Sequence, residues 1–253
     1  MGLPQQVKKR FKRFSEAWSF RLPRNASLLA ATLLLASLLP PATALAEPSA
    51  QEILKLARAS ESAQNQNFTG KLTTSSSKGK VVVPFRLSMQ GPTITYQFLD
   101  APPEALILRM GAKGSRLERA IGSGRTKVVS GDKLDALVRG TDITYEDLAM
   151  GFLYWNNAKV IGDENLMTRR CWVVQAVPSG RESQYDTVRL WIEKTGGLLR
   201  AECFIRGKLV KRFEVRSVQR APGGGYVLKT LTVQRMDAAG KDRYPTRLVL
   251  TPS

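Results

Sequence analysis

The sequence predicts a mainly β protein, in which a long antiparallel sheet curls into an open or closed barrel and a few short helices cover its apolar face. Three observations lead to this fold class. Apolar residues alternate with polar ones through most of the chain after residue 80, glycine-bearing turns separate these runs, and only two regions have a helical pattern. So few helices over a broad sheet can leave an apolar hollow between the two layers.

The first 46 residues have the pattern of a secretory signal peptide. Basic residues precede an apolar run over residues 26–39, two prolines end the run, and Ala44-Leu45-Ala46 forms a small-x-small cleavage site. An uncleaved anchor is the alternative, but the run is shorter than the ~20 residues that a spanning helix needs. We expect cleavage after Ala46, a periplasmic protein without a lipid anchor, and a single domain over residues 47–253.

The chain is strongly basic and contains no histidine. Lys and Arg number 39 and Asp and Glu number 21, so the formal net charge is +18, of which residues 1–46 carry +6 and leave +12. These charges solvate the outer face of the sheet, or they attract anionic lipid or an acidic partner. Because the protein is expected to be exported, nucleic acid is not an expected partner. The missing histidine removes the commonest general base and zinc ligand, which favours binding over catalysis.

The first predicted element after the signal is a helix. Ser49 and Glu52 have the spacing of a capping box, in which each side chain satisfies a free backbone amide of the first turn. Apolar residues then recur at i, i+3, i+4 and i+7, which predicts one buried stripe. The stripe consists of Ala50, Ile53, Leu54 and Ala57. The polar segment 60–67 ends the helix.

Period-two alternation follows over residues 81–89 and 94–98, with a Gly91-Pro92 turn between them, and a hairpin is expected over 106–110 and 115–120. Apolar side chains on one face of the first two strands form either the wall of a cavity or part of a closed core. We treat six of them as candidate wall residues: Val83, Phe85, Leu87, Ile94, Tyr96 and Phe98.

The region 132–156 changes character and is expected to form one or two short helices. Residues 132–139 have a helical pattern, and Thr144 and Asp147 resemble a second capping box. Asp142, Glu146 and Asp147 could be read as a metal or acid–base cluster, but capping at a positive helix N-terminus explains these acids. Three aromatic residues could line the mouth of a cavity as part of a lid, or simply pack on the sheet. They are Phe152, Tyr154 and Trp155.

The alternation returns at Cys171 and continues to the end of the chain, which predicts an antiparallel meander. Its strands are expected over residues 171–177, 187–194, 198–206, 208–217, 226–235 and 243–250. In such a meander Cys171 and Cys203 lie two strands apart, roughly 9–10 Å, which is beyond the reach of a disulfide. We therefore expect two free, partly buried thiols.

Three segments of the chain resemble the outer-membrane lipoprotein-sorting proteins of the LolA-like superfamily. They are residues 140–148 (GTDITYEDL), 172–174 (WVV) and 188–193 (VRLWIE), the last followed by a Gly-Gly turn and further strands. The resemblance implies an open half-barrel with helices packed on its concave side as a lid. Carriers of this family shield lipoprotein acyl chains in that hollow, and an arginine helps to hold the lid closed; related folds serve as sensors of envelope stress and as lipid binders.

The resemblance therefore implies a periplasmic carrier that sequesters lipoprotein acyl chains or lipid and helps to sort lipoproteins to the outer membrane. We expect a monomer that meets a membrane-bound donor or acceptor protein transiently. The alternative is a periplasmic sensor or regulatory module that uses the same fold to bind a membrane protein. No catalytic constellation is visible, so we predict no enzymatic activity, no cofactor and no metal site.

Overall fold

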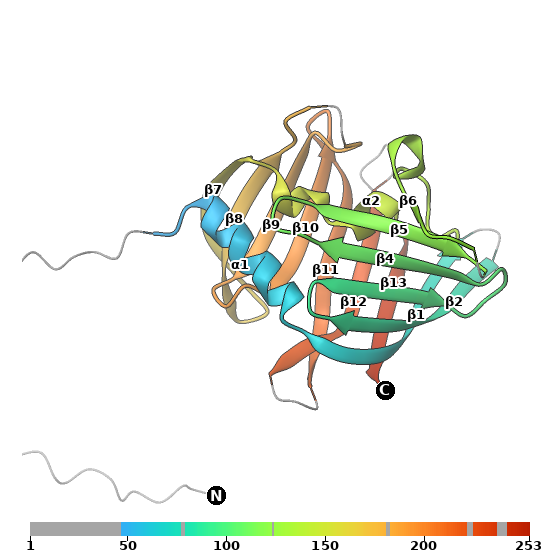
Figure 1. Ribbon diagram of the computed structural model, residues 1–253. Helices are drawn as coiled ribbons and strands as arrows, with labels where there is room; N and C mark the ends of the chain where they lie inside the picture. Colours follow the sequence, from blue (N-terminus) through green and yellow to red (C-terminus); the bar gives the residue numbers. More distant parts are fainter. Residues whose placement is uncertain (1–46, 77–78, 123, 181–182, 222–224, 237–241) are drawn as a thin grey trace, which may run out of the picture. The chain divides into compact units, whose positions relative to one another are not determined.

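The computed structural model describes residues 47–76, 79–122, 124–180, 183–221, 225–236 and 242–253, so the expected signal peptide lies outside the described residues. Within these ranges, thirteen strands form a single sheet, whose curvature is visible in Figure 1. The strands are β1 (Asn65–Ser76), β2 (Gly79–Gln90), β3 (Thr93–Phe98), β4 (Glu104–Met110), β5 (Ser115–Ile121), β6 (Lys127–Val128), β7 (Asn157–Leu166), β8 (Arg169–Val177), β9 (Thr187–Glu193), β10 (Leu198–Ile205), β11 (Lys208–Arg220), β12 (Tyr226–Met236) and β13 (Asp242–Pro252).

The sheet consists of two antiparallel meanders that meet at one strand pair. The strand order is β6-β5-β4-β3-β2-β1-β13-β12-β11-β10-β9-β8-β7, so β1 and β13 join the two halves. The edge strands β6 and β7 do not pair with each other, and the curved sheet forms the expected open half-barrel instead of a closed barrel. All ten strands expected from period-two alternation are present.

The described residues also form two helices, α1 (Ala50–Ser62) and α2 (Tyr145–Ala149), and two 3₁₀ turns, η1 (Gly131–Lys133) and η2 (Gly151–Tyr154). The helices and η2 pack on the concave side of the sheet (Figure 1), whereas η1 has no buried residue. Both predicted capping boxes form, at Ser49 with Glu52 and at Thr144 with Asp147. The predicted stripe of α1 is buried and belongs to the same apolar core as the inner face of β2. None of the helices in the described part of the chain is long and apolar enough to span a bilayer.

The structure corrects the sequence-based prediction at four places. One is the two-residue strand β6, which the sequence does not predict. Strand β1 begins in the polar segment expected to end the helix and continues over residues for which the sequence predicts no element. Among its described side chains only Phe68, Leu72 and Thr74 are buried, so its period is weak. Strand β7 was not expected, because it is an exposed edge strand with one buried residue, Leu166. The segment 132–139 forms a 3₁₀ turn and bends instead of a helix.

Candidate functional site

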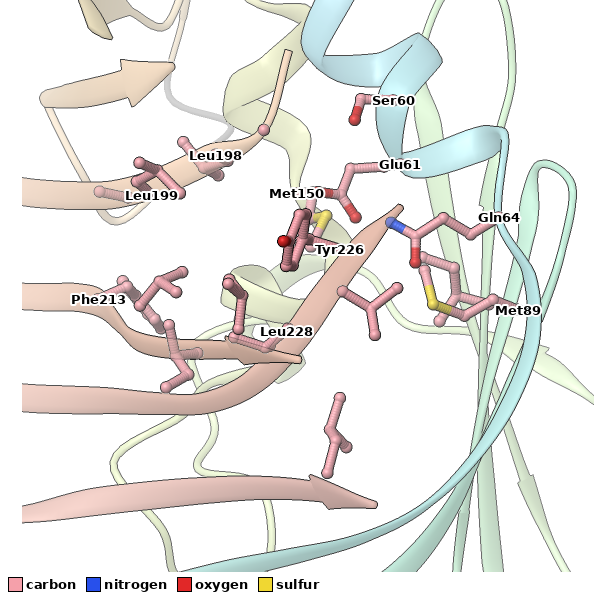
Figure 2. Close-up of a pocket in the computed structure, with 18 of the residues that line it drawn as sticks. Ser60, Glu61, Gln64, Met89, Met150, Leu198, Leu199, Phe213, Tyr226 and Leu228 are labelled. Carbon is pink, nitrogen blue, oxygen red and sulfur yellow. The ribbon is translucent and has the colours of Figure 1, made fainter. Parts of the chain in front are cut away.

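A cavity of about 260 Å³ lies between the end of α1 and the inner side of the sheet (Figure 2). Strands β1–β3 form one wall and β10–β12 form the opposite wall, while α2 and η2 contribute to the lining from the centre. Most of the lining is apolar; its side chains include Phe68, Leu87, Met89, Ile94, Leu198, Phe213 and Leu228. Tyr226 is 68% exposed and lies where the cavity reaches solvent.

The six candidate wall residues do share one face of the sheet, but they divide into two groups. Cross-strand neighbours pair Phe85 with Phe98 and Leu87 with Tyr96. Leu87, Ile94 and Tyr96 line the cavity. The other three, Val83, Phe85 and Phe98, are buried in the core beside it and are not among the lining residues.

Gly70 on β1 explains why Phe85 belongs to the core. A Cβ atom at Gly70 would lie 2.1 Å from the Phe85 ring, so the ring occupies the space that a side chain would fill. The ring also packs against Phe98 and Tyr96, with centroid distances of 6.2 and 6.0 Å. A charged residue at position 85 would therefore destabilise the fold, so such a variant cannot show whether the cavity wall binds a ligand.

The three lid candidates also divide. Phe152 is buried and lines the cavity. Tyr154 instead packs under Arg58 of α1, whose guanidinium carbon is 4.8 Å from the ring centroid. Trp155 is buried, and its carbonyl oxygen accepts a hydrogen bond of 3.0 Å from Gln51 of α1. Two of the three aromatics therefore attach η2 and the residue after it to α1.

The polar part of the lining is not predicted from the sequence; it comes from the last turn of α1 and the residues after it. Ser60, Glu61 and Gln64 line the cavity, and Figure 2 shows Glu61 and Gln64 directed into it. Glu61 follows Ala57 at i+4, so the helical period that predicts the buried stripe also places Glu61 on that face. Burial raises the pKa of the Glu61 carboxyl, and burial together with that carboxylate raises the pKa of Tyr96.

The acids of the 142–147 segment anchor α2 to the sheet. Asp147 forms a buried ion pair of 2.6 Å with Lys211 of β11 and accepts a hydrogen bond of 2.8 Å from the Tyr185 hydroxyl. Asp147 also belongs to the capping box, in which its carboxylate accepts a hydrogen bond of 2.7 Å from the Thr144 backbone amide. Burial, and then the Asp147 carboxylate, raise the pKa of Tyr185.

The neighbouring acids have similar structural roles. Asp142 accepts a hydrogen bond of 2.8 Å from Thr246, and Glu146 accepts from the Ser183 hydroxyl and from the Gln184 amide. Burial raises the pKa of Glu146, although these hydrogen bonds oppose the shift. Within the described ranges, no group of three or more His, Cys, Asp and Glu side chains could hold a metal ion.

Cys171 and Cys203 lie on β8 and β10, with β9 between them. Both are free, as predicted, but they are fully buried and not partly buried as expected. Burial raises the pKa of each thiol. Because the thiolate is the reactive form, both cysteines are expected to be unreactive at neutral pH. The cavity itself can bury apolar groups of a ligand and make a few polar contacts at one end.

Several solved structures resemble this fold over about four fifths of the chain. A domain named as an outer membrane lipoprotein-sorting protein, from Vibrio parahaemolyticus, is 16% identical, with a TM-score of 0.63 over 81% of this chain and 93% of its own. A DUF1329 family protein from Desulfovibrio piger is 16% identical, with a TM-score of 0.62 over 80% and 91%. A LolA superfamily protein from Nitrosomonas europaea is 14% identical, with a TM-score of 0.59 over 81% and 92%.

Comparison of the sequence with the curated proteins gives no match. A family model described as "uncharacterized protein" does match residues 122–251. This match runs from the end of β5 to β13 and so includes α2, η2 and the whole C-terminal meander. Since the match covers just over half of the chain, the protein belongs to the family that this model describes, and its fold is the LolA-like fold.

Proposed function

We propose that this protein is a periplasmic carrier that binds the acyl chains of lipoproteins, or of lipid, in the cavity under α1. The observation that carries the proposal is the cavity itself, about 260 Å³ in volume and lined mainly by apolar side chains. An engineered apolar cavity of ~150 Å³ already takes up benzene. Each methylene group that leaves water for such a site contributes about 0.8 kcal/mol.

The mechanism would be sequestration without chemistry. Leu87, Ile94 and Tyr96 would contact the chain directly, and the buried Val83, Phe85 and Phe98 would hold these wall residues in place. The helix α1 and the η2 turn would form the lid, with Phe152 on its inner side. Opening at a membrane-bound partner would release the cargo, and the basic surface would favour docking on anionic lipid. The names of two solved relatives, a lipoprotein-sorting domain and a LolA superfamily protein, support this substrate class.

The location in the periplasm rests on the signal pattern of residues 1–46. The full chain, expressed in an exporting host, is expected to yield a processed protein that begins at Glu47. Sequencing of the N-terminus of the purified protein tests this. An unprocessed chain that remains in the membrane fraction would contradict both the cleavage site and the soluble carrier.

Native mass spectrometry of the exported protein, purified without detergent, tests the carrier function. We expect a bound mass in the range of a phospholipid or lipopeptide. The Leu228→Asp variant places a charge in the half-buried cavity wall and should lose this mass. Val82→Asp is the matched control, because Val82 is 44% exposed on β2. A protein free of lipid that takes up none, but captures a membrane protein's exported domain, would support the sensor module instead.

A further inference from the structure

Glu61 is an acidic side chain in an otherwise mainly apolar cavity. It lies on the last turn of α1, is half-buried and lines the cavity (Figure 2). Among the described residues, no side chain or backbone group donates a hydrogen bond to its carboxylate or forms an ion pair with it. Arg58, one turn earlier, is directed elsewhere: it donates to the Leu153 carbonyl and covers the Tyr154 ring.

The other charged side chains that line the cavity all have partners. There are three such ion pairs, with N···O distances of 2.6, 2.6 and 2.7 Å: Lys211 with Asp147, Arg169 with Glu193, and Arg200 with Glu214. Glu61 is thus the one lining charge that the described residues leave uncompensated. When Glu61 is ionised, the cavity carries a local negative charge, although the protein as a whole is strongly basic.

An unpaired carboxylate in apolar surroundings is unfavourable, because it loses hydration without gaining a donor. This cost would disappear if the ligand itself brought a positively charged hydrogen-bond donor to the carboxylate. Ser60 and Gln64 lie on the same side of the cavity as Glu61 and can also accept hydrogen bonds. They could therefore contact the same polar end of a ligand. On the opposite wall, side chains such as Leu228 and Phe213 offer apolar contacts for an acyl chain.

We propose that the cavity selects amphiphiles whose polar end carries a protonated primary amine, which Glu61 binds while the acyl chain lies against the apolar walls. This inference rests on the proposed carrier function and specifies its ligand. The amine belongs either to a phospholipid headgroup or to a lipidated peptide with a free amino group. Both sources present the same ammonium group, with three N–H donors, next to an acyl chain.

Competition for a bound fluorescent lipid tests the ligand class, with the full exported chain at pH 8. The three competitors are decylammonium, neutral decanol and decyltrimethylammonium, which is charged but has no N–H donor. A charge-assisted hydrogen bond should make decylammonium bind at least about 10-fold more tightly than decanol. In the Glu61→Gln variant, decylammonium and decanol should bind within about 2-fold of each other. Asp135→Asn is the control, because it removes an exposed acid and should keep the preference.

The outcomes separate the two proposals. If decanol binds but decylammonium has no advantage, or if the advantage survives in Glu61→Gln, the inference is wrong and the carrier function stands. If none of the three competitors and no fluorescent lipid binds, both proposals are wrong.

Two further pairs identify the source of the amine. Short-chain phosphatidylethanolamine is compared with phosphatidylcholine, and an S-hexadecyl-cysteinyl peptide with its N-acetylated form. Preference for the amine in one pair assigns that source, whereas no preference in either pair would overturn the amine-bearing cargo.

Discussion

The helices α1 and α2 cover the same concave face, but they are attached to it in different ways. The contacts of α1 are an apolar stripe and hydrogen bonds from Gln51 and Arg58 to backbone carbonyls of residues 153–156. The contacts of α2 include the buried ion pair of Asp147 with Lys211 and a hydrogen bond of 3.2 Å from the Tyr145 hydroxyl to Glu104.

This difference indicates which helix can move. If α1 lifts away, its hydrogen-bond donors and the carbonyls they contact can bond to water instead. If α2 lifts away, it separates buried charges that have little access to water, which is far more costly. We therefore expect α1 to open the cavity and α2 to remain fixed as part of its floor.

The largest effect should follow from removing the anchor of α2. Lys211→Met leaves Asp147 as a buried charge without its cation and should lower the free energy of unfolding by about 3–5 kcal/mol. Urea denaturation measures this change. Arg216→Met is the control: its ion pair with Glu214 is exposed, so its loss should cost at most about 1 kcal/mol. Equal losses in the two variants would mean that α2 is held no more firmly than a surface ion pair.

A somewhat smaller effect is expected where α1 meets the turn between β9 and β10. Gly196 has a φ of +100°, and a Cβ atom there would lie 2.9 Å from the Leu56 carbonyl oxygen of α1. Gly196→Ala should therefore cost about 2–3 kcal/mol, through backbone strain and through displacement of α1.

The matched control for this prediction is Gly207→Ala. Gly207 has a φ of +72°, but nothing lies within 4 Å of its Cβ position, so the variant should show backbone strain alone, about 1 kcal/mol. Thermal unfolding of both variants gives the difference. Identical losses would show that α1 can withdraw from this turn at no cost.

A kinetic effect should follow from loosening α1 without unfolding it. Arg58→Met removes the hydrogen bond to the Leu153 carbonyl and the contact with Tyr154. The lid should then open more often, and a bound fluorescent lipid should exchange about 5–10-fold faster, as expected for the loss of roughly 1 kcal/mol. Stopped-flow exchange measures the rate. Lys55→Met, also on α1 but exposed, should exchange at the wild-type rate; a faster rate there would mean that any change in α1 opens the lid.

The parts of this fold that the sequence predicts are those with a strong local signal. The capping boxes at Ser49 and Thr144, and the alternation in β2, β3 and β8–β13, depend on neighbouring residues and are all present. Strands β1 and β7 could not be predicted in this way, because few of their side chains are buried. Strand β1 pairs with β13, which is distant in the sequence. Strand β7 pairs with β8 at the edge of the sheet.

The site is harder to predict than the fold, because a cavity is the space that side chains leave empty. Alternation correctly places Phe85 and Leu87 on one face of β2, but it cannot show that Gly70 on the next strand makes room for the Phe85 ring and removes it from the lining. The opposite wall, with Phe213 and Tyr226, comes from strands more than 100 residues away. Glu61 lies at i+4 from Ala57, but the predicted helix ends at the polar segment 60–67, whereas α1 continues to Ser62, so this site residue was missed as well.

The smallest effect is expected from replacing Glu61 of α1 or Glu146 of α2, of which the first is half-buried and the second buried. Burial raises the pKa of both Glu61 and Glu146, so the folded state retains a proton that the unfolded chain loses above the ordinary glutamate pKa of 4.5. The free energy of unfolding therefore falls as the pH rises from the ordinary glutamate pKa through the raised pKa of the folded state. A glutamine at either position cannot titrate, so the variant does not show this fall. The two carboxylates differ in that Glu146 accepts hydrogen bonds from Ser183 and Gln184, whereas Glu61 has no such donor among the described residues.

The two glutamine variants should consequently differ from the wild type at different pH values. Glu61→Gln should match the wild type at pH 4 and exceed it at pH 8, by less than about 1 kcal/mol because the side chain is only half-buried. Glu146→Gln should be less stable than the wild type at pH 4, by about 1 kcal/mol, because an amide cannot replace both accepted hydrogen bonds. Urea denaturation at the two pH values measures both differences. A Glu61→Gln variant that is less stable at pH 8 would mean that the carboxylate already has a partner in the free protein, and the unpaired acid in the lid helix would no longer distinguish α1 from the anchored α2.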